Sequence, residues 1–140
     1  VQKVQQAFYD PFEYLWLRHK GGAFNTEFPN AIGSVAYQVA CHQRVQKIGL
    51  KTRDILALVA DSDIVAYERC SGHDGTYAVK SETRAKSVKI ARPTVKKVDA
   101  QAPDHLISDC PMAGAQIADL AESVDTALHP MTLLRMAYGF

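Results

Sequence analysis

"SVAYQVAC", residues 34–41, is a run of apolar and β-branched residues that ends in a cysteine. Two further runs have the same form, "SDIVAYERC" at 62–70 and "DHLISDC" at 104–110. Short runs of this composition are typical of β-strands. The sequence therefore predicts three strands, each ending at a cysteine.

Helical patterns separate these strands and follow them. Residues 50–60 carry Ile55, Leu56 and Val59 at helical spacing, with Thr52 as a candidate N-cap. Further helices are expected at 77–98, with a kink or break at Pro93, and at 111–124 and 129–140. Strands that alternate with helices favour crossover connections. We therefore expect an α/β fold, a small parallel sheet flanked by helices, with the cysteines at the carboxyl ends of the strands.

The first 33 residues are expected to form an N-terminal helix and a linker, ahead of a cysteine-rich domain at 34–140. Asp10 is a candidate N-cap and Pro11 suits the first helical position, before a face with Phe12 and Trp16. The first residue is valine, which indicates a processed chain or part of a longer one.

The composition is that of a soluble globular protein with one ordinary core. The chain has 140 residues, of which 47% are hydrophobic and 22% charged, with a net charge of +1. The basic excess typical of nucleic-acid binding is missing, and the lysines and arginines of 77–98 are expected to face solvent. No apolar run approaches the roughly 18–20 residues that span a bilayer.

The positions of Cys41, Cys70 and Cys110 suggest a shared site. In an open parallel sheet the carboxyl ends of the strands lie along one edge, where the loops form the binding crevice. An odd number of cysteines argues against a closed disulfide framework. Thiols that meet at one edge are candidate metal ligands. The alternative is that all three are ordinary core residues.

The loop "CSGHDG", residues 70–75, adds groups to the same edge. Gly72 and Gly75 would let the backbone pass close to a bulky inorganic group and direct N–H groups at it. His73 is the leading candidate for a fourth ligand, or for a donor to one. A pairing of the Cys70 thiol with the His73 imidazole as nucleophile and base is a lesser alternative.

Two neighbours of the cysteines are interpreted without a metal. His42, which follows Cys41, is expected to be a surface histidine. Asp109, which precedes Cys110, is expected to cap the helix that comes next.

Four segments resemble, in this order, the cysteine-rich CCG domain of iron–sulfur oxidoreductases: "VACHQRVQKIG", "RCSGHDGTYAVK", "SDCPMAGAQIA" and "HPMTLLRMAYG". That domain occurs in iron–sulfur oxidoreductase subunits, among them those of anaerobic glycerol-3-phosphate dehydrogenase, heterodisulfide reductase and glycolate oxidase. The resemblance spans residues 34–138. It implies an iron–sulfur-cluster-binding electron-transfer domain of an oxidoreductase, and leaves open whether the chain is itself an enzyme.

The family pattern has five cysteines, and the resemblance implies which residues match them. Cys41, Cys70 and Cys110 match three, whereas Ser71 and Ala113 stand where the other two would be. The resemblance favours a [4Fe–4S] cluster whose fourth iron takes another ligand, and leaves open a [3Fe–4S] cluster.

Other outcomes remain open on the same residues. His73 or Ser71 could complete the cluster's ligands, or His73 could join the thiols in a Cys3His zinc site. The scaffold could also be a metal-free interaction module.

The partners implied by the resemblance are redox proteins. They are a flavin dehydrogenase subunit or a ferredoxin-like domain on the N-terminal side of the same chain. Nucleic acid is not an expected partner. The resemblance implies a cytoplasmic protein, and leaves open a peripheral position at the inner membrane face through partners.

Overall fold

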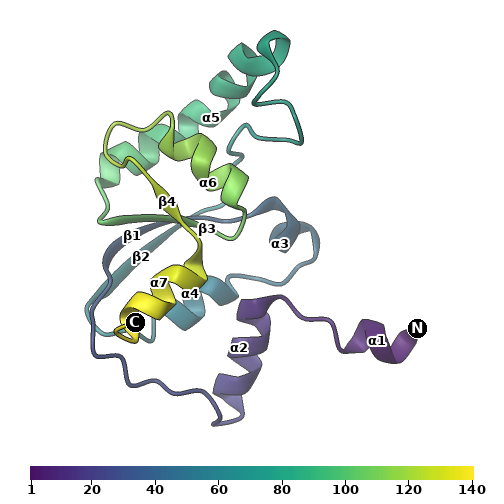
Figure 1. Cartoon of the computed structure of the whole chain (residues 1–140), viewed down its shortest axis with the longest axis vertical. Coiled ribbons are helices and arrows are strands. Elements are labelled where there is room, and N and C mark those ends of the chain that lie inside the picture. The colour runs from purple at the N-terminus through teal and green to yellow at the C-terminus, as the bar shows by residue number, and fades with distance from the viewer.

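Four parallel strands form one small sheet in the computed structural model, which describes residues 1–140 (Figure 1). The strands lie in the order β2-β1-β3-β4, and each neighbouring pair is parallel. This arrangement confirms the expected α/β class with a small parallel sheet flanked by helices. The bounds are β1 (Gly33–Gln38), β2 (Ser62–Tyr67), β3 (His105–Ser108) and β4 (Ala127–Leu128), of which β4 was not expected.

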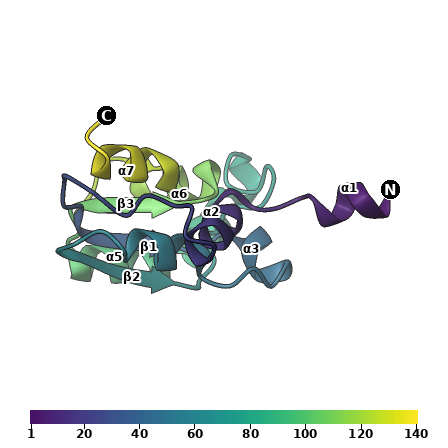
Figure 2. The same cartoon turned by 90° about the horizontal axis from the view of Figure 1, so that it is seen from below.

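The protein has seven helices, and five of them cover the two faces of the sheet (Figures 1 and 2). One layer is formed by α2, α4 and α7, and the other by α5 and α6. The bounds are α1 (Gln2–Gln6), α2 (Pro11–Lys20), α3 (Cys41–Val45), α4 (Lys51–Leu56), α5 (Ser81–Gln101), α6 (Pro111–Ala118) and α7 (Pro130–Ala137).

The central strand β1 is buried on both faces. Val35 and Tyr37 belong to the core cluster under α2, α4 and α7, whereas Ala36 belongs to the cluster under α5 and α6. A parallel strand covered on both sides needs apolar residues at successive positions, which explains the unbroken run in the sequence. The expected core residues Ile55, Leu56 and Val59 are buried in the first cluster.

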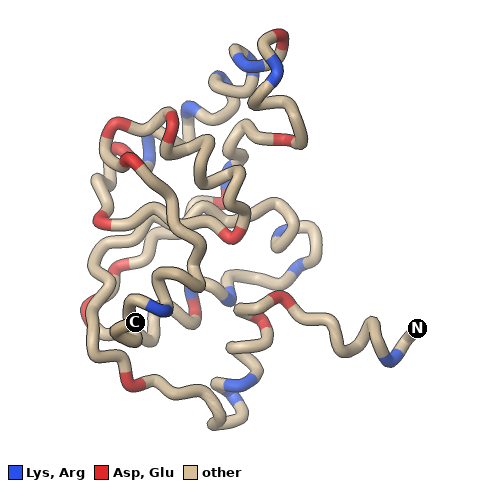
Figure 3. The backbone as a smooth tube through the Cα atoms, viewed as in Figure 1, with Lys and Arg blue, Asp and Glu red and all other residues tan.

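The helix α5 continues through Pro93, so the expected break is not found. A proline inside a helix leaves the carbonyl of the residue four positions earlier without its N–H partner. That residue is Lys89, and both it and Pro93 are exposed. Because water can satisfy this carbonyl, the helix continues. Most of the cations of α5 are exposed, as expected, and Figure 3 shows their places along the helix: Lys86, Lys89, Arg92, Lys96 and Lys97. Arg84 differs, because it is partly buried and bonds to α6.

The two expected N-caps have different outcomes. Asp10 caps α2, because its Oδ1 accepts hydrogen bonds from the backbone N–H groups of Phe12 and Glu13. Thr52 does not cap α4, whose N-cap is Leu50. The Thr52 hydroxyl is buried and bonds elsewhere, as described below.

The N-terminal segment has two parts with different environments. α1 contributes no buried residue and lies away from the rest of the protein in both views (Figures 1 and 2). α2 packs beside α4, and Phe12 is fully buried in the main core cluster. No helix in the protein is both long enough and apolar enough to cross a membrane.

We expect Phe12→Ala to destabilise the protein by about 3–5 kcal/mol, because it removes a buried aromatic ring from the core. The matched control is Phe8→Ala, since Phe8 is 79% exposed. That change should alter the free energy of unfolding by about 0.5 kcal/mol or less. Urea unfolding of both variants measures the difference, and equal effects would contradict the docking of α2 on the sheet.

Candidate site at the carboxyl edge of the sheet

The three cysteines follow the carboxyl ends of three adjacent strands. Cys41 begins α3 after β1, Cys70 lies in the loop after β2, and Cys110 is the N-cap of α6 after β3. Cys41 and Cys70 are exposed, Cys110 is partly exposed, and all three are free thiols. Their common edge is as predicted, and the alternative of three buried core cysteines is wrong.

The topology places a switch point between the ends of β1 and β3. The chain leaves β1 toward α4 on one face of the sheet and leaves β3 toward α6 on the other. Where consecutive connections diverge in this way, parallel sheets bind their ligands. Cys41 and Cys110 follow the two strands that flank this switch point, and Cys70 lies in the loop after the neighbouring strand β2.

The helix α5 holds the loop that carries Cys70. The Thr94 hydroxyl donates to the Cys70 carbonyl at 2.9 Å, and the Ser87 hydroxyl donates to the Gly72 carbonyl at 2.7 Å. The Gly72 N–H donates to the Cys70 Sγ at 3.4 Å. The loop therefore directs an N–H group at a thiol sulfur, which is the contact that tunes iron–sulfur centres.

The two glycines of this loop have different surroundings. Gly72 has a φ of 77°, and a Cβ there would lie 2.2 Å from the Ser87 carbonyl oxygen. Gly72 is thus required by its conformation and by the close approach of α5. Gly75 has a φ of 50°, and a Cβ there would have nothing within 4 Å, so this glycine serves a turn in open space.

A chain of hydrogen bonds couples this loop to the helix behind Cys110. The Gln116 side chain on α6 donates to the Ser87 Oγ at 2.9 Å. Arg84 donates to the Gln116 Oε1 at 2.6 Å and to Asp119 at 2.6 Å. The Cys70 loop and α6 are therefore held in register through α5.

The remaining candidates near the cysteines are only partly engaged. The His73 imidazole is partly exposed and makes no hydrogen bond, and none joins it to Cys70. Ser71 is buried, and its hydroxyl accepts the His73 N–H at 3.3 Å. His42 is a surface histidine, as expected, with its Nε2 4.0 Å from the Asp10 carboxylate.

The interpretation of Asp109 as a helix cap is wrong. α6 has no side-chain cap, and the N–H of Cys110 instead donates to the Ser108 hydroxyl at 3.1 Å. Asp109 turns toward the opposite layer because buried polar partners lie there. Its Oδ2 lies 2.8 Å from the Tyr37 hydroxyl, and both carboxyl oxygens lie 3.1 Å from the Thr52 hydroxyl.

The side chains of Tyr37, Gln43, Thr52 and Asp109 form a closed ring of hydrogen bonds near this switch point. The sequence analysis did not predict this ring. The Tyr37 hydroxyl lies 2.7 Å from the Gln43 Oε1, and the Gln43 Nε2 lies 3.3 Å from the Thr52 hydroxyl. Four contacts need four hydrogens, of which tyrosine, glutamine and threonine each supply one. With these three hydrogens each counted once, the fourth contact is complete when Asp109 carries a proton. Turning the glutamine amide over leaves this count unchanged.

The electrostatics agree with a neutral ring. Burial raises the pKa of Asp109 and is the largest influence on it, although its bonds to Tyr37 and Thr52 act in the other direction. Burial also raises the pKa of Tyr37, with the nearby Asp109 carboxyl as the next cause. Both groups therefore favour their uncharged forms.

The side chains at this edge can be compared with the ligands that a zinc ion and an iron–sulfur cluster each need. No three His, Cys, Asp or Glu side chains converge closely enough to hold a metal ion. Zinc needs four ligands at about 2.0–2.3 Å from one point, so the side chains as they lie do not form a Cys3His site. Cys41, Cys70 and Cys110 are free thiols that follow three adjacent strands, and thiolates are the ligands that iron–sulfur clusters take.

Comparisons of the chain with protein family models, with curated proteins and with solved structures found no match. The resemblance to the CCG domain therefore stays a prediction.

We expect Gly72→Ala to lower the free energy of unfolding by about 2 kcal/mol or more. The added Cβ meets the backbone of α5 in addition to the cost of a left-handed conformation. Gly75→Ala is the matched control, with a positive φ but open space, and should cost about 1 kcal/mol. Denaturant unfolding compares them, and an equal cost would contradict the close approach of α5.

Asp109 predicts a measurable pH dependence of stability. Its pKa is raised in the folded protein, so the folded state holds the proton more tightly than the unfolded state, whose pKa is about 3.9. The contribution is complete below about pH 4 and is lost as the pH rises through the folded pKa, by at most about 1.4 kcal/mol per pH unit.

The measurement is the free energy of unfolding of the wild type minus that of Asp109→Asn, from pH 4 to pH 8. Asparagine supplies the N–H hydrogen of the neutral ring at every pH, so this difference should fall as the pH rises. A flat or rising difference would show that Asp109 is ionised in the folded protein.

Proposed function

We propose that this chain is an iron–sulfur-cluster-binding electron-transfer domain of an oxidoreductase, with Cys41, Cys70 and Cys110 as the ligands. The observation that supports it best is the placement of all three cysteines, as free and accessible thiols, at the carboxyl ends of three adjacent parallel strands. When bound, a cluster supplies one-electron redox chemistry, with [4Fe–4S] as the favoured type.

The residues around the thiols have separate roles in this proposal. Cys41 and Cys110 flank the switch point between β1 and β3. Cys70 completes the ligand set from the loop after β2. The Gly72 N–H bonds the Cys70 sulfur, and N–H groups bonded to a ligand sulfur would favour electron uptake by a bound cluster. His73 is the leading fourth ligand or donor, since its imidazole has no other hydrogen bond.

The proposed partner is a redox protein, either a flavin dehydrogenase subunit or a ferredoxin-like domain. The exposed cations of α5, which begins directly after the Cys70 loop, favour a partner with an acidic surface (Figure 3). Such complementarity speeds encounter between transient partners more than it raises affinity.

The test is the content of iron, acid-labile sulfide and zinc, with a visible spectrum, in protein purified without oxygen. We expect near-equal iron and sulfide with broad absorption toward the violet in the wild type, and loss of most iron in Cys70→Ala. Thr76→Ala is the matched control, because Thr76 is an exposed residue of the same loop. It should keep its iron.

The other outcomes are equally informative. Iron and an unchanged spectrum in Cys70→Ala would place the site elsewhere. Zinc without sulfide in the wild type would replace the proposal with the zinc alternative, and neither metal would leave a metal-free module. Because a metal that binds only the folded state stabilises it, removal by a chelator should also lower the Tm of the wild type.

A further inference from the structure

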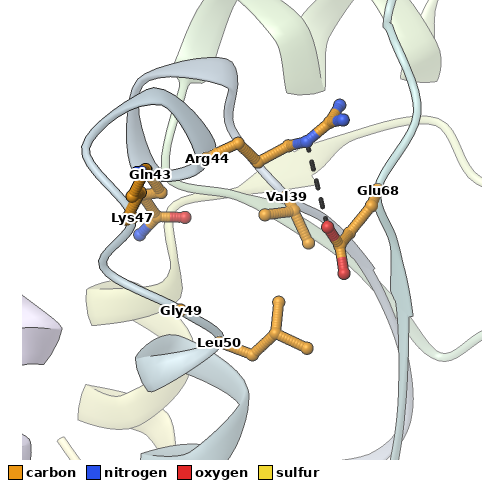
Figure 4. Close-up of a pocket in the computed structure, with 7 residues that line it drawn as sticks. All are labelled: Val39, Gln43, Arg44, Lys47, Gly49, Leu50 and Glu68. Atoms are coloured by element: carbon orange, nitrogen blue, oxygen red, sulfur yellow. Dashed lines mark ion pairs between the residues drawn. The ribbon is translucent and has the colours of Figure 1, made fainter.

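A pocket of about 350 Å³ lies at the carboxyl edge between the chain segments that follow β1 and β2 (Figure 4). Val39 comes directly after β1 and Glu68 directly after β2, and α3 with the turn behind it supplies the rest. The edge is the one that carries the cysteines. The lining side chains are Val39, Gln43, Arg44, Lys47, Leu50 and Glu68.

The charges of this lining favour an anion. The Arg44 Nε lies 3.8 Å from the Glu68 Oε2, and the two side chains are 47% and 56% exposed. So exposed an ion pair is weak, and an incoming anion can replace Glu68 as the partner of the guanidinium. Lys47 takes part in no ion pair. The lining therefore keeps one uncompensated positive charge.

The inner surface of the pocket is apolar. Val39 is buried and Leu50 partly buried, and Figure 4 shows Val39 beside the Arg44–Glu68 pair with Leu50 below it. Charge at the rim over apolar side chains matches a ligand with an anionic group and a short apolar chain.

The end of α3 fixes the backbone at Lys47. Lys47 has a φ of 56° and directly follows Gln46, the C-cap of α3. The Ile48 N–H donates to the Gln43 carbonyl at 3.1 Å and the Lys47 N–H donates to the Arg44 carbonyl at 3.2 Å, which is the Schellman pattern of a helix end. This turn places Lys47 in the lining of the pocket.

Arg44 connects the pocket to the candidate redox site. It also lines a neighbouring hollow of about 390 Å³ together with Cys41 and Val45. An anion bound by Arg44 would therefore lie near Cys41.

We propose that this pocket binds a small organic acid, whose carboxylate meets Arg44 and Lys47 and whose apolar chain meets Val39 and Leu50. The inference names the substrate class of the redox site. It rests on the proposed function for the role of the ligand, but its binding is measured separately.

The test titrates hexanoate onto the full chain, purified without oxygen, by saturation-transfer difference NMR. The uncharged isostere hexanamide is titrated in the same way, and inorganic phosphate, which has no carbon-bound hydrogen to observe, is measured by its competition with hexanoate. We expect saturable hexanoate binding with a Kd of about 1 mM, as for a good ligand of this size. Hexanamide and phosphate should each bind at least about tenfold more weakly, because each lacks one half of the recognition.

Two variants should move the Kd for hexanoate in opposite directions. Arg44→Gln should raise it about tenfold, and Glu68→Gln should lower it by about threefold or more, since the competing carboxylate is gone. Arg18→Gln, at an exposed arginine on α2 that lines no part of the pocket, is the matched control and should leave the Kd unchanged.

Non-saturable binding, equal binding of hexanamide, or a shift of both variants in the same direction would overturn the inference. Iron is counted in the same samples, which separates the two proposals. Iron without hexanoate binding contradicts only the pocket, and hexanoate binding without iron contradicts only the redox function.

Discussion

The arrangement depends on the pairing of β1 with a parallel strand on each side. Its backbone groups are taken up by β2 and β3 along the strand, and its side chains enter the cores on both faces. Parallel neighbours can be joined only by crossovers, so helices must cover both faces. The connection after β1 leaves on one face of the sheet and the connection after β3 leaves on the other. The switch point between Cys41 and Cys110 results from this divergence.

The ring of buried polar side chains near that switch point connects four segments, and the hydrogen bonds of the sheet do not connect all of them. Tyr37 comes from β1, Gln43 from α3, Thr52 from α4 and Asp109 from the loop after β3. Buried polar groups are costly unless all are bonded, so a complete ring fixes these segments in one arrangement. The same applies to Ser87 and Gln116, which hold the Cys70 loop against α5 and α6. Buried hydrogen bonds therefore hold the segments next to the three thiols in place.

The sequence allowed the fold and the edge to be predicted because both follow from local patterns. The apolar runs of β1 and β2, and the helical spacing of Ile55 and Val59, reflect burial on a strand or a helix. The ring was missed because its members lie far apart in the chain, and each has an ordinary local interpretation. Thr52 and Asp109 are both good caps by residue type, and only packing shows that they bond to one another. Tyr37, a tyrosine inside a mainly apolar strand, was a signal in the sequence that this ring needed a buried polar partner.

A neutral Asp109 also suits the chemistry proposed above it. Thiolates at Cys41, Cys70 and Cys110 would place negative charge at the edge, and an organic acid in the pocket would add to it. An ionised carboxylate next to Cys110 would oppose both, because charges interact strongly where water is scarce. Burial in the ring raises the pKa of Asp109 and so lessens that opposition, and negative charge at the edge would raise this pKa further. The ring and the thiols thus influence one another through electrostatics, without a direct hydrogen bond between them.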